Sequence, residues 1–213
     1  MKFPTIYYIN CAHRVDRKQH LEAELDKLRR IVPELQVIRI EATYIPSNGA
    51  LGCGLSHIKA LEFAIASDDE EAIILEDDFT FRDGGSIDMK DKVEFLMTGL
   101  IDWEVCLLAG NLKKHEPVNG MDFYHNVTQA YTTTAYVIKR NYIPRLLKTF
   151  TGACEHLVQS GPQVHDNCID TVWQQLQAVD QWICCWPLVG YQYPNFSDIE
   201  KRESDYRHLM GGT

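Results

Sequence analysis

The sequence predicts an α/β fold with a central, mostly parallel mixed sheet flanked by helices. Apolar, β-branched segments of strand length alternate with segments whose apolar residues recur every three or four positions, the spacing of one helix face. Strands that alternate with helices are typical of a parallel sheet covered by helices. No Pro-, Gly- or Ser-rich linker and no internal repeat divides the 213 residues. We therefore expect one domain over residues 1–213.

The first half of the chain contains five predicted elements. Residues 5–11 (TIYYINC) are β-branched and aromatic, which favours a buried strand, and leucines at helical spacing over 21–31 predict a helix. Residues 37–42 place apolar and charged side chains on opposite faces, as a strand does. After a Pro/Ser/Asn/Gly loop, apolar spacing over 58–65 predicts a second helix. The apolar run 71–75 (EAIIL) predicts a strand that ends in three acids.

The second half is less regular. Residues 103–109 and 131–138 are apolar and predict two further strands, whereas 88–100, 141–150 and 168–178 have the spacing of helices. Together these segments continue the alternation of strands and helices. They support the same sheet rather than a second domain.

Charge and composition limit the partners. The formal net charge of −9 opposes nucleic-acid binding, which depends on clustered Lys and Arg. A phosphorylated small ligand would need a local positive source, such as a divalent cation. The seven cysteines are odd in number, lack any CxxC pair and are expected to be reduced. We see neither a signal-peptide pattern nor an apolar run long enough for a membrane span, so we predict a cytoplasmic protein.

The acidic triplet Glu76-Asp77-Asp78 is the first candidate site. It follows a buried strand, and in open α/β sheets ligands collect outside the carboxyl ends of the strands. Carboxylates so close together repel one another, and a hard divalent ion such as Mg²⁺ or Mn²⁺ offsets that repulsion. The alternative is a solvated acidic turn, which is common after strands.

Several motifs in a fixed order resemble glycosyltransferase family 25, the lipopolysaccharide-type transferases. The opening strand with its Arg-x-Asp-Arg, the Gly-Cys-x-x-Ser-His segment, the Leu-Glu-Asp-Asp motif, the Ala-Tyr-hydrophobic-Ile strand and a late Ser-Asp-Ile are all similar to the family's pattern. In this chain they lie at 8–17, 52–57, 75–78, 135–138 and 197–199. The resemblance therefore spans nearly the whole sequence.

This resemblance implies a GT-A type, Rossmann-like fold and a metal-dependent hexosyltransferase. The family uses its acidic motif to hold Mn²⁺ or Mg²⁺ against the diphosphate of a sugar nucleotide, with a UDP-sugar as donor and a glycan or glycoprotein as acceptor. The chain is especially similar to compact transferases that large algal viruses use to build capsid glycans, which would imply glucose or rhamnose donors and the host cytoplasm. The nucleotide-sugar half would cover about 1–110 and the acceptor half about 111–213.

The resemblance also implies roles for individual acids. Asp78 would be the direct metal ligand, and Glu76 or Asp77 would contact the ribose or the donor sugar. Glu76 stands where the usual Asp-x-Asp motif has its first Asp. Its longer side chain argues against the direct ribose contact that the Asp makes in the family. His208 and Asp198 are candidates for a further metal ligand from the C-terminal region.

Residues outside the triplet would complete the nucleotide site. Ile9, Asn10 and Arg14 follow the first strand, whose loop cradles nucleotides in such folds; a solvated helix-start residue is the alternative for Arg14. Ser56 and His57 would meet the nucleotide or donor sugar. Alternatively, Ser56 is a helix N-cap and His57 bonds the backbone.

Asp166 and Asp170 are the candidate residues near the acceptor. They are four residues apart, so one face of a helix would carry both. Either carboxylate could remove the proton of the acceptor hydroxyl. Asp170 is the preferred base, since Asp166 could equally cap the following helix.

Two further classes of function compete with a transferase. A binding module of the same fold could hold a sugar nucleotide or glycan without turning it over. A Mg²⁺-dependent phosphatase or nucleotidyltransferase would also use clustered acids, but the sequence contains no GxxxxGK[ST] loop and no Asp-x-Asp-x-Thr motif.

Overall fold

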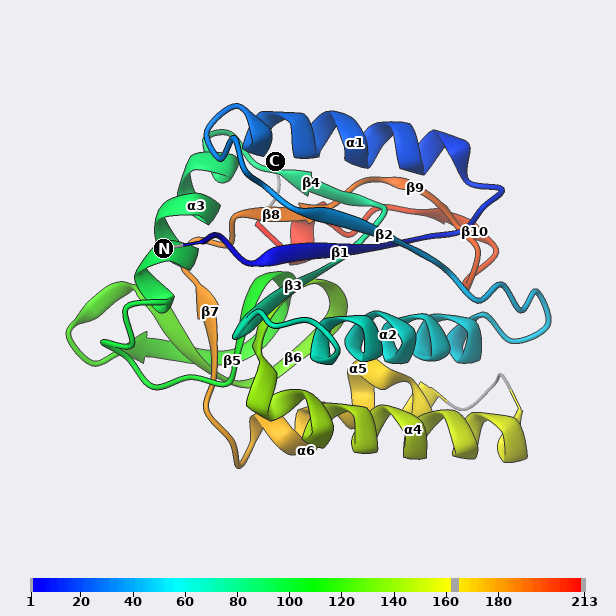
Figure 1. The fold of residues 1–213 in the computed structure, drawn as a ribbon. Helices are drawn as coiled ribbons and strands as arrows, with labels where there is room; N and C mark the ends of the chain where they lie inside the picture. Colours follow the sequence, from blue (N-terminus) through cyan, green and yellow to red (C-terminus); the bar gives the residue numbers. More distant parts are fainter. Residues whose placement is uncertain (1, 162–164, 212–213) are drawn as a thin grey trace.

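The computed structural model describes residues 2–161 and 165–211. Its centre is a six-stranded sheet in the order β2-β1-β3-β6-β5-β7 (Figure 1). The pairings show that β6 runs opposite to the other five strands, so the predicted mostly parallel mixed sheet is confirmed. The strands are β1 Thr5–Asn10, β2 Val37–Glu41, β3 Glu71–Glu76, β5 Val105–Val118, β6 Met121–Lys139 and β7 Trp182–Cys185.

Helices cover both faces of this sheet (Figure 1). The helices α1 (Val15–Arg29) and α3 (Gly85–Leu96) pack on one face, and α2 (Gly49–Ile65) and α4 (Ile143–Ser160) pack on the other. The short helices are α5 (Ile169–Val172) and α6 (Gln174–Gln177), with 3₁₀ turns η1 (Arg140–Tyr142), η2 (His165–Asn167) and η3 (Arg207–Leu209).

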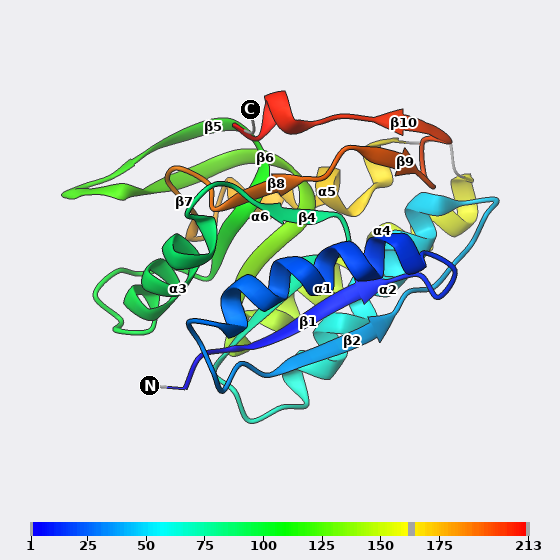
Figure 2. The ribbon, with the colours of Figure 1, turned by 90° about the horizontal axis from the view of Figure 1, so that it is seen from above.

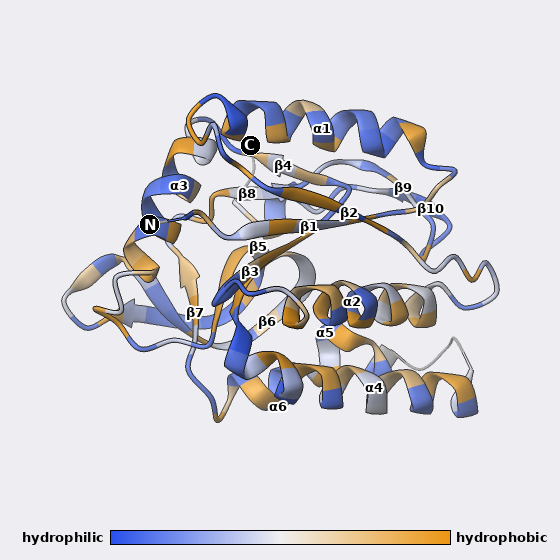
Figure 3. Cartoon of the chain, in the orientation of Figure 1, coloured by the Kyte–Doolittle hydropathy of each residue, from blue (hydrophilic) through white to orange (hydrophobic). Residues whose placement is uncertain are grey.

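The period-two pattern of β1 explains why the sheet has two cores. Tyr7 and Ile9 pack toward α2 and α4, whereas Ile6 and Tyr8 pack toward α1 and α3. All four side chains are buried, as expected for a strand covered on both faces. Figure 3 shows the strands largely hydrophobic and the outer side of α1 largely hydrophilic. Burial of these apolar faces is the main force that holds the helices to the sheet.

Several predicted boundaries are wrong, including those of two helices near the site. The second helix begins at Gly49 rather than near Ile58, because the Asn48 side chain caps it by accepting a hydrogen bond from the Leu51 N–H at 3.1 Å. The 51–57 segment is therefore helical, and Ser56 is not its N-cap. The helix predicted over 168–178 is divided into α5 and α6, which meet at Trp173.

Four short strands form two additional ribbons that the sequence does not predict. One pairs β4 (Phe79–Phe81) with β8 (Gly190–Gln192), and the other pairs β9 (Asn195–Ser197) with β10 (Arg202–Ser204). Seen from above in Figure 2, β9 and β10 lie toward the end of the molecule at which α1 begins. These ribbons bring the C-terminal segment to the acidic end of β3. Among the described helices, none combines the length and apolar character needed to cross a bilayer.

Candidate active site

The acidic triplet lies at the carboxyl end of β3, where a cavity of about 140 Å³ opens beside β1 and α2. Glu76 is the last residue of the strand, and the next two acids form the turn to β4. The cavity gathers most of the residues predicted for nucleotide-sugar and metal binding. They are Ile9, Asn10, Arg14, Ser56, His57, Glu76, Asp77 and Asp78.

Arg17 holds the second and third acids together. Its Nη1 atom lies 3.0 Å from Asp77 Oδ1 and 3.3 Å from Asp78 Oδ2. Asn10 donates to Asp77 Oδ2 at 2.7 Å, and Gln192 donates to Asp78 Oδ2 at 2.9 Å. Burial raises the pKa of Asp77, although Arg17 and Asn10 oppose this effect. Burial raises the pKa of Asp78 to about 7, against the opposing charge of Arg17.

Asp78 retains an unused ligand atom. Its side chain is 2% exposed, and its Oδ1 is buried without a hydrogen-bond partner. Such an atom is costly unless something binds it. A hard divalent ion prefers carboxylate oxygen, and Mg²⁺ or Mn²⁺ typically takes one or two carboxylates with waters and phosphates completing its shell. Asp78 therefore fits such an ion, with Asp77, whose two oxygens contact Arg17 and Asn10, beside it.

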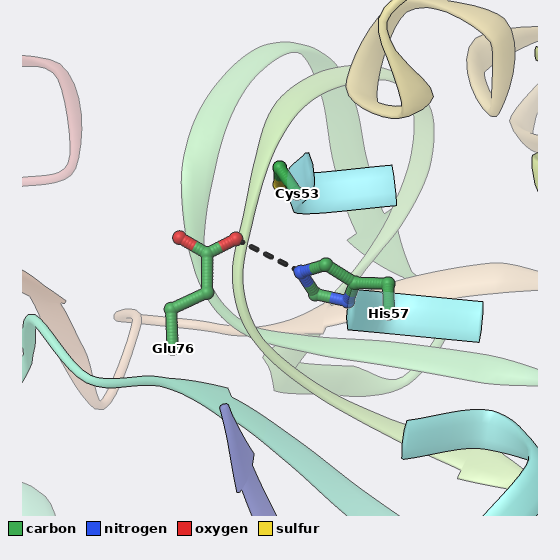
Figure 4. A group of neighbouring side chains, drawn as sticks. All are labelled: Cys53, His57 and Glu76. Atoms are coloured by element: carbon green, nitrogen blue, oxygen red, sulfur yellow. Dashed lines mark hydrogen bonds and ion pairs between the residues drawn. The ribbon is translucent and has the colours of Figure 1, made fainter. Parts of the chain in front are cut away.

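Glu76 is held differently, by two donors on a single oxygen. His57 Nε2 lies 3.0 Å from Glu76 Oε1, and the Thr133 hydroxyl donates to the same atom at 2.6 Å. Figure 4 shows the Glu76 carboxylate facing His57, with its second oxygen directed away. Burial acts to raise the pKa of Glu76, but the bonds from His57 and Thr133 outweigh it and hold that pKa below its ordinary value. Glu76 is thus a partly buried carboxylate, 21% exposed, whose ionised form these two bonds favour.

α2 positions His57 and Ser56. His57 is fully buried, and its Nδ1 lies 3.2 Å from the Tyr136 hydroxyl on β6. The Ser56 hydroxyl donates to the Gly52 carbonyl at 2.6 Å and accepts from the Thr43 N–H at 2.8 Å. A Cβ at Gly52 would lie 2.6 Å from the Thr43 carbonyl oxygen, so this close approach requires glycine. Ser56 consequently fixes the β2–α2 loop that forms one cavity wall.

Arg14 connects the start of α1 to the β9–β10 ribbon. Its guanidinium contacts Asp16 Oδ2 at 2.9 Å and Asp198 Oδ2 at 2.8 Å, and it donates to the Phe196 carbonyl at 3.1 Å. Arg17 also donates to that carbonyl, at 3.0 Å. The two arginines on the cavity wall therefore hold the C-terminal ribbon against the site.

A larger cavity of about 840 Å³ adjoins the first, and Glu76 lines both. Asp170, on α5, lines the larger cavity, and its Oδ2 accepts from the Thr132 N–H at 3.2 Å. Thr132 has a φ of 65°, which is strained for a β-branched residue and brings the adjacent Thr133 to Glu76. Asp170 and Glu76 therefore line the same cavity.

Two other predicted residues lie elsewhere. Asp166, on η2, and His208, on η3, are both exposed, and neither lines the two cavities just described. Asp198 lines the smaller cavity, where Arg14 pairs with it. The larger cavity receives Tyr206 and Leu209 from the segment around His208 instead.

Sequence reasoning missed four residues that shape the site. Arg17 belongs to the Arg-x-Asp-Arg pattern, and Cys53 lies four residues before His57 on one helix, so both had a detectable signal. Thr133 and Gln192 reach the acids from β6 and β8. Their positions depend on the bulged hairpin and the short ribbon, which have no clear pattern in the sequence.

A Rossmann-like sheet with a carboxylate-rich cavity at the carboxyl ends of its parallel strands defines a protein that binds a ligand at that edge. Residues 40–157, more than half of the chain, match the family described as glycosyltransferase family 25 (LPS biosynthesis protein). The chain belongs to this family. The resemblance inferred from its motifs is confirmed, and membership supports glycosyltransferase function.

Several solved structures share part of this arrangement. One, involved in glycosylation of the major capsid of PBCV-1, has 9% identity over 84% of this chain and 80% of its own, with a TM-score of 0.49. The Streptococcus pneumoniae glycosyltransferase GlyE has 8% identity over 86% of this chain and 45% of its own, with a TM-score of 0.49. A Drosophila β-1,4-galactosyltransferase 7 mutant in complex with manganese, UDP-Gal and xylobiose has 11% identity over 96% of this chain and 72% of its own, with a TM-score of 0.40. No curated protein sequence matches the chain. With every TM-score below 0.5, the family assignment rests on the family match.

Proposed function

We propose that the chain transfers a hexose from a UDP-sugar to a glycan or glycoprotein acceptor, in a reaction that depends on Mn²⁺ or Mg²⁺. The observation that carries this proposal is the buried, unpartnered Oδ1 of Asp78 on the wall of a cavity at the end of β3. Leaving a buried carboxylate oxygen unpaired is costly, and a bound ion would satisfy it.

The smaller cavity is the proposed donor site. Asn10 and Arg14 lie at its β1 end, and Arg17 places a fixed positive charge between Asp77 and Asp78. A bound Mn²⁺ or Mg²⁺ would supply further positive charge for the diphosphate leaving group, held by Asp78 with Asp77 beside it. The protein's own part is to hold the donor at the end of β3, with Glu76 toward the sugar.

The larger cavity is the proposed acceptor site. Asp170 and Glu76 both line it, so an acceptor bound there would have two carboxylates in the walls around it. We assign Asp170 as the base that accepts the hydroxyl proton, with Asp166, which is exposed on the preceding turn, as the less direct alternative. The Thr132 N–H fixes one Asp170 oxygen and thereby its orientation.

Calorimetric titration and a transfer assay test these assignments together. Wild-type protein should bind UDP only with Mn²⁺ present, Asp78→Ala should lose that binding, and Asp170→Asn should keep it while transfer from UDP-glucose or UDP-rhamnose slows by about 10²–10⁴-fold. Asp91→Asn is the matched control, because Asp91 is an exposed acid on α3 that lines neither cavity. UDP binding that survives in Asp78→Ala would remove Asp78 from the site. Tight binding without transfer to any glycan would favour a binding module instead.

A further inference from the structure

A second group of potential metal ligands lies between the two cavities. Cys53 and His57 are four residues apart on α2 and face the same side, toward Glu76 at the end of β3 (Figure 4). Cys53 Sγ, His57 Nε2 and a Glu76 carboxylate oxygen all lie within 4.8 Å of one another. Ligands of a tetrahedral ion with bonds of about 2.0–2.3 Å lie roughly 3.3–3.7 Å apart. His57 Nε2 and Glu76 Oε1 are already 3.0 Å apart, so a movement of about 1 Å of Cys53 Sγ toward them would complete the set.

Hydrogen bonds from neighbouring strands already orient two of these ligands. The Tyr136 hydroxyl lies 3.2 Å from His57 Nδ1, and the Thr133 hydroxyl donates to Glu76 Oε1 at 2.6 Å. Metal-bound histidines are usually oriented by a partner on the other ring nitrogen, and metal-bound carboxylates are in turn hydrogen-bonded. Burial raises the pKa of Tyr136 well above its ordinary value, so its hydroxyl stays neutral and can accept from Nδ1–H. The supporting contacts of a metal site are thus present.

The ligand chemistry of this group differs from that of Asp78. Sulfur and imidazole nitrogen suit Zn²⁺ and related ions, whereas the carboxylates around Asp78 suit Mg²⁺ and Mn²⁺. We propose that Cys53, His57 and Glu76 form a binding site for a thiolate-accepting divalent ion such as Zn²⁺, separate from the oxygen site at Asp78. On binding, the Cys53 thiol releases its proton to solvent. His57 gives up the Nε2 proton that bonds Glu76, binds the ion through Nε2, and carries its remaining proton on Nδ1, facing the Tyr136 hydroxyl.

Occupation of this site has a direct consequence for transfer. Cys53 and Glu76 line both the smaller and the larger cavity, so an ion held by them sits where donor and acceptor meet. It also takes the Glu76 carboxylate away from the substrates. Zn²⁺ therefore inhibits transfer at concentrations at which the Mn²⁺ site remains functional.

Cobalt substitution tests the site without relying on activity. Co²⁺ added to the full chain should give a near-ultraviolet sulfur-to-cobalt charge-transfer band that saturates at one ion per chain, and Zn²⁺ should abolish it. Cys53→Ser should lose the band and bind Zn²⁺ at least about tenfold more weakly. Cys11→Ser is the matched control, since Cys11 is an equally half-buried cysteine in the smaller cavity, and it should keep the band.

Further variants separate this proposal from the transferase proposal. Asp78→Ala should keep the cobalt band while it loses Mn²⁺-dependent UDP binding, and Glu76→Gln should weaken cobalt binding but retain the sulfur band. Circular dichroism and thermal melting confirm that each variant is folded. Absence of the band in wild-type protein, or its survival in Cys53→Ser, would overturn the proposed site. Loss of the band in Cys11→Ser would show that the cobalt-bound sulfur belongs to Cys11, and would overturn the site at Cys53.

Discussion

The buried Asp78 should make the protein less stable at neutral pH than in mild acid, and Asp78→Asn should remove this effect. In the folded chain burial raises the pKa of Asp78 to about 7, whereas its ordinary value is 3.8. The folded state therefore holds a proton on Asp78 at pH values at which the unfolded chain has lost it. Stability contributed by this group is greatest below about pH 4, falls as pH rises toward 7, and is flat above.

The size of the effect follows from the difference of about 3 pH units. At ~1.36 kcal/mol per unit, ionised Asp78 lowers the free energy of unfolding by about 4 kcal/mol at high pH. Rather more than half of this, about 2–3 kcal/mol, develops between pH 5 and pH 8. The Asn variant keeps the shape of the side chain without its charge. Its stability relative to wild type should consequently increase by about 2–3 kcal/mol over that interval.

Urea unfolding at pH 5 and pH 8, with EDTA present, measures this difference. Comparing the variant with wild type at each pH cancels the titration of other groups, because those groups are shared. Asp91→Asn, at an exposed position, is the matched control. A gap between Asp78→Asn and wild type that does not change from pH 5 to pH 8 would refute the idea that Asp78 is held as a strained, ligand-ready carboxylate.

Two other perturbations follow from the same contacts. Arg17→Met should lower the free energy of unfolding by about 3–5 kcal/mol, because Asp77 and Asp78 lose their shared buried cation. Urea unfolding at pH 8 measures this loss. A loss below about 1 kcal/mol would mean that these two carboxylates are effectively solvated. Thr133→Val should slow transfer by about tenfold with UDP affinity unchanged, since Glu76 Oε1 loses one of its two donors. A wild-type rate in that variant would show that Thr133 does not position Glu76.

The predictable part of the site lies on regular elements. β1 and β3 have continuous apolar sequences, so their carboxyl ends and the acids and polar residues that follow them could be placed from the sequence. Parallel pairing then brings Asn10 next to the acidic triplet, as the 2.7 Å contact with Asp77 shows. The family motifs added His57 and Ser56 from the preceding helix.

The unpredicted part depends on backbone irregularity and on long-range contacts. Thr133 reaches Glu76 because Thr132 adopts a positive φ in a bulged hairpin, and nothing in a β-branched residue signals that conformation. Gln192 lies on a three-residue strand, too short for a period-two pattern. Gly52 and Gly54 favour a loop over 51–57 in the sequence, whereas the structure places this segment inside α2. Gly54 in fact allows α2 to approach α4, since a Cβ there would lie 2.6 Å from Cys154 Sγ.

The central claim is that the cavity at β3 binds a nucleotide diphosphate through a divalent metal. A thermal-shift panel of UDP, GDP, CMP and ADP, each with Mn²⁺ or with EDTA, tests it most directly, because a ligand that binds only the folded state raises the melting temperature. At a concentration of 100 Kd, UDP with Mn²⁺ should stabilise the protein by about 2.7 kcal/mol, a shift of several degrees, and UDP with EDTA should give none. No shift with any nucleotide and Mn²⁺, or an equal UDP shift in EDTA, would contradict the claim.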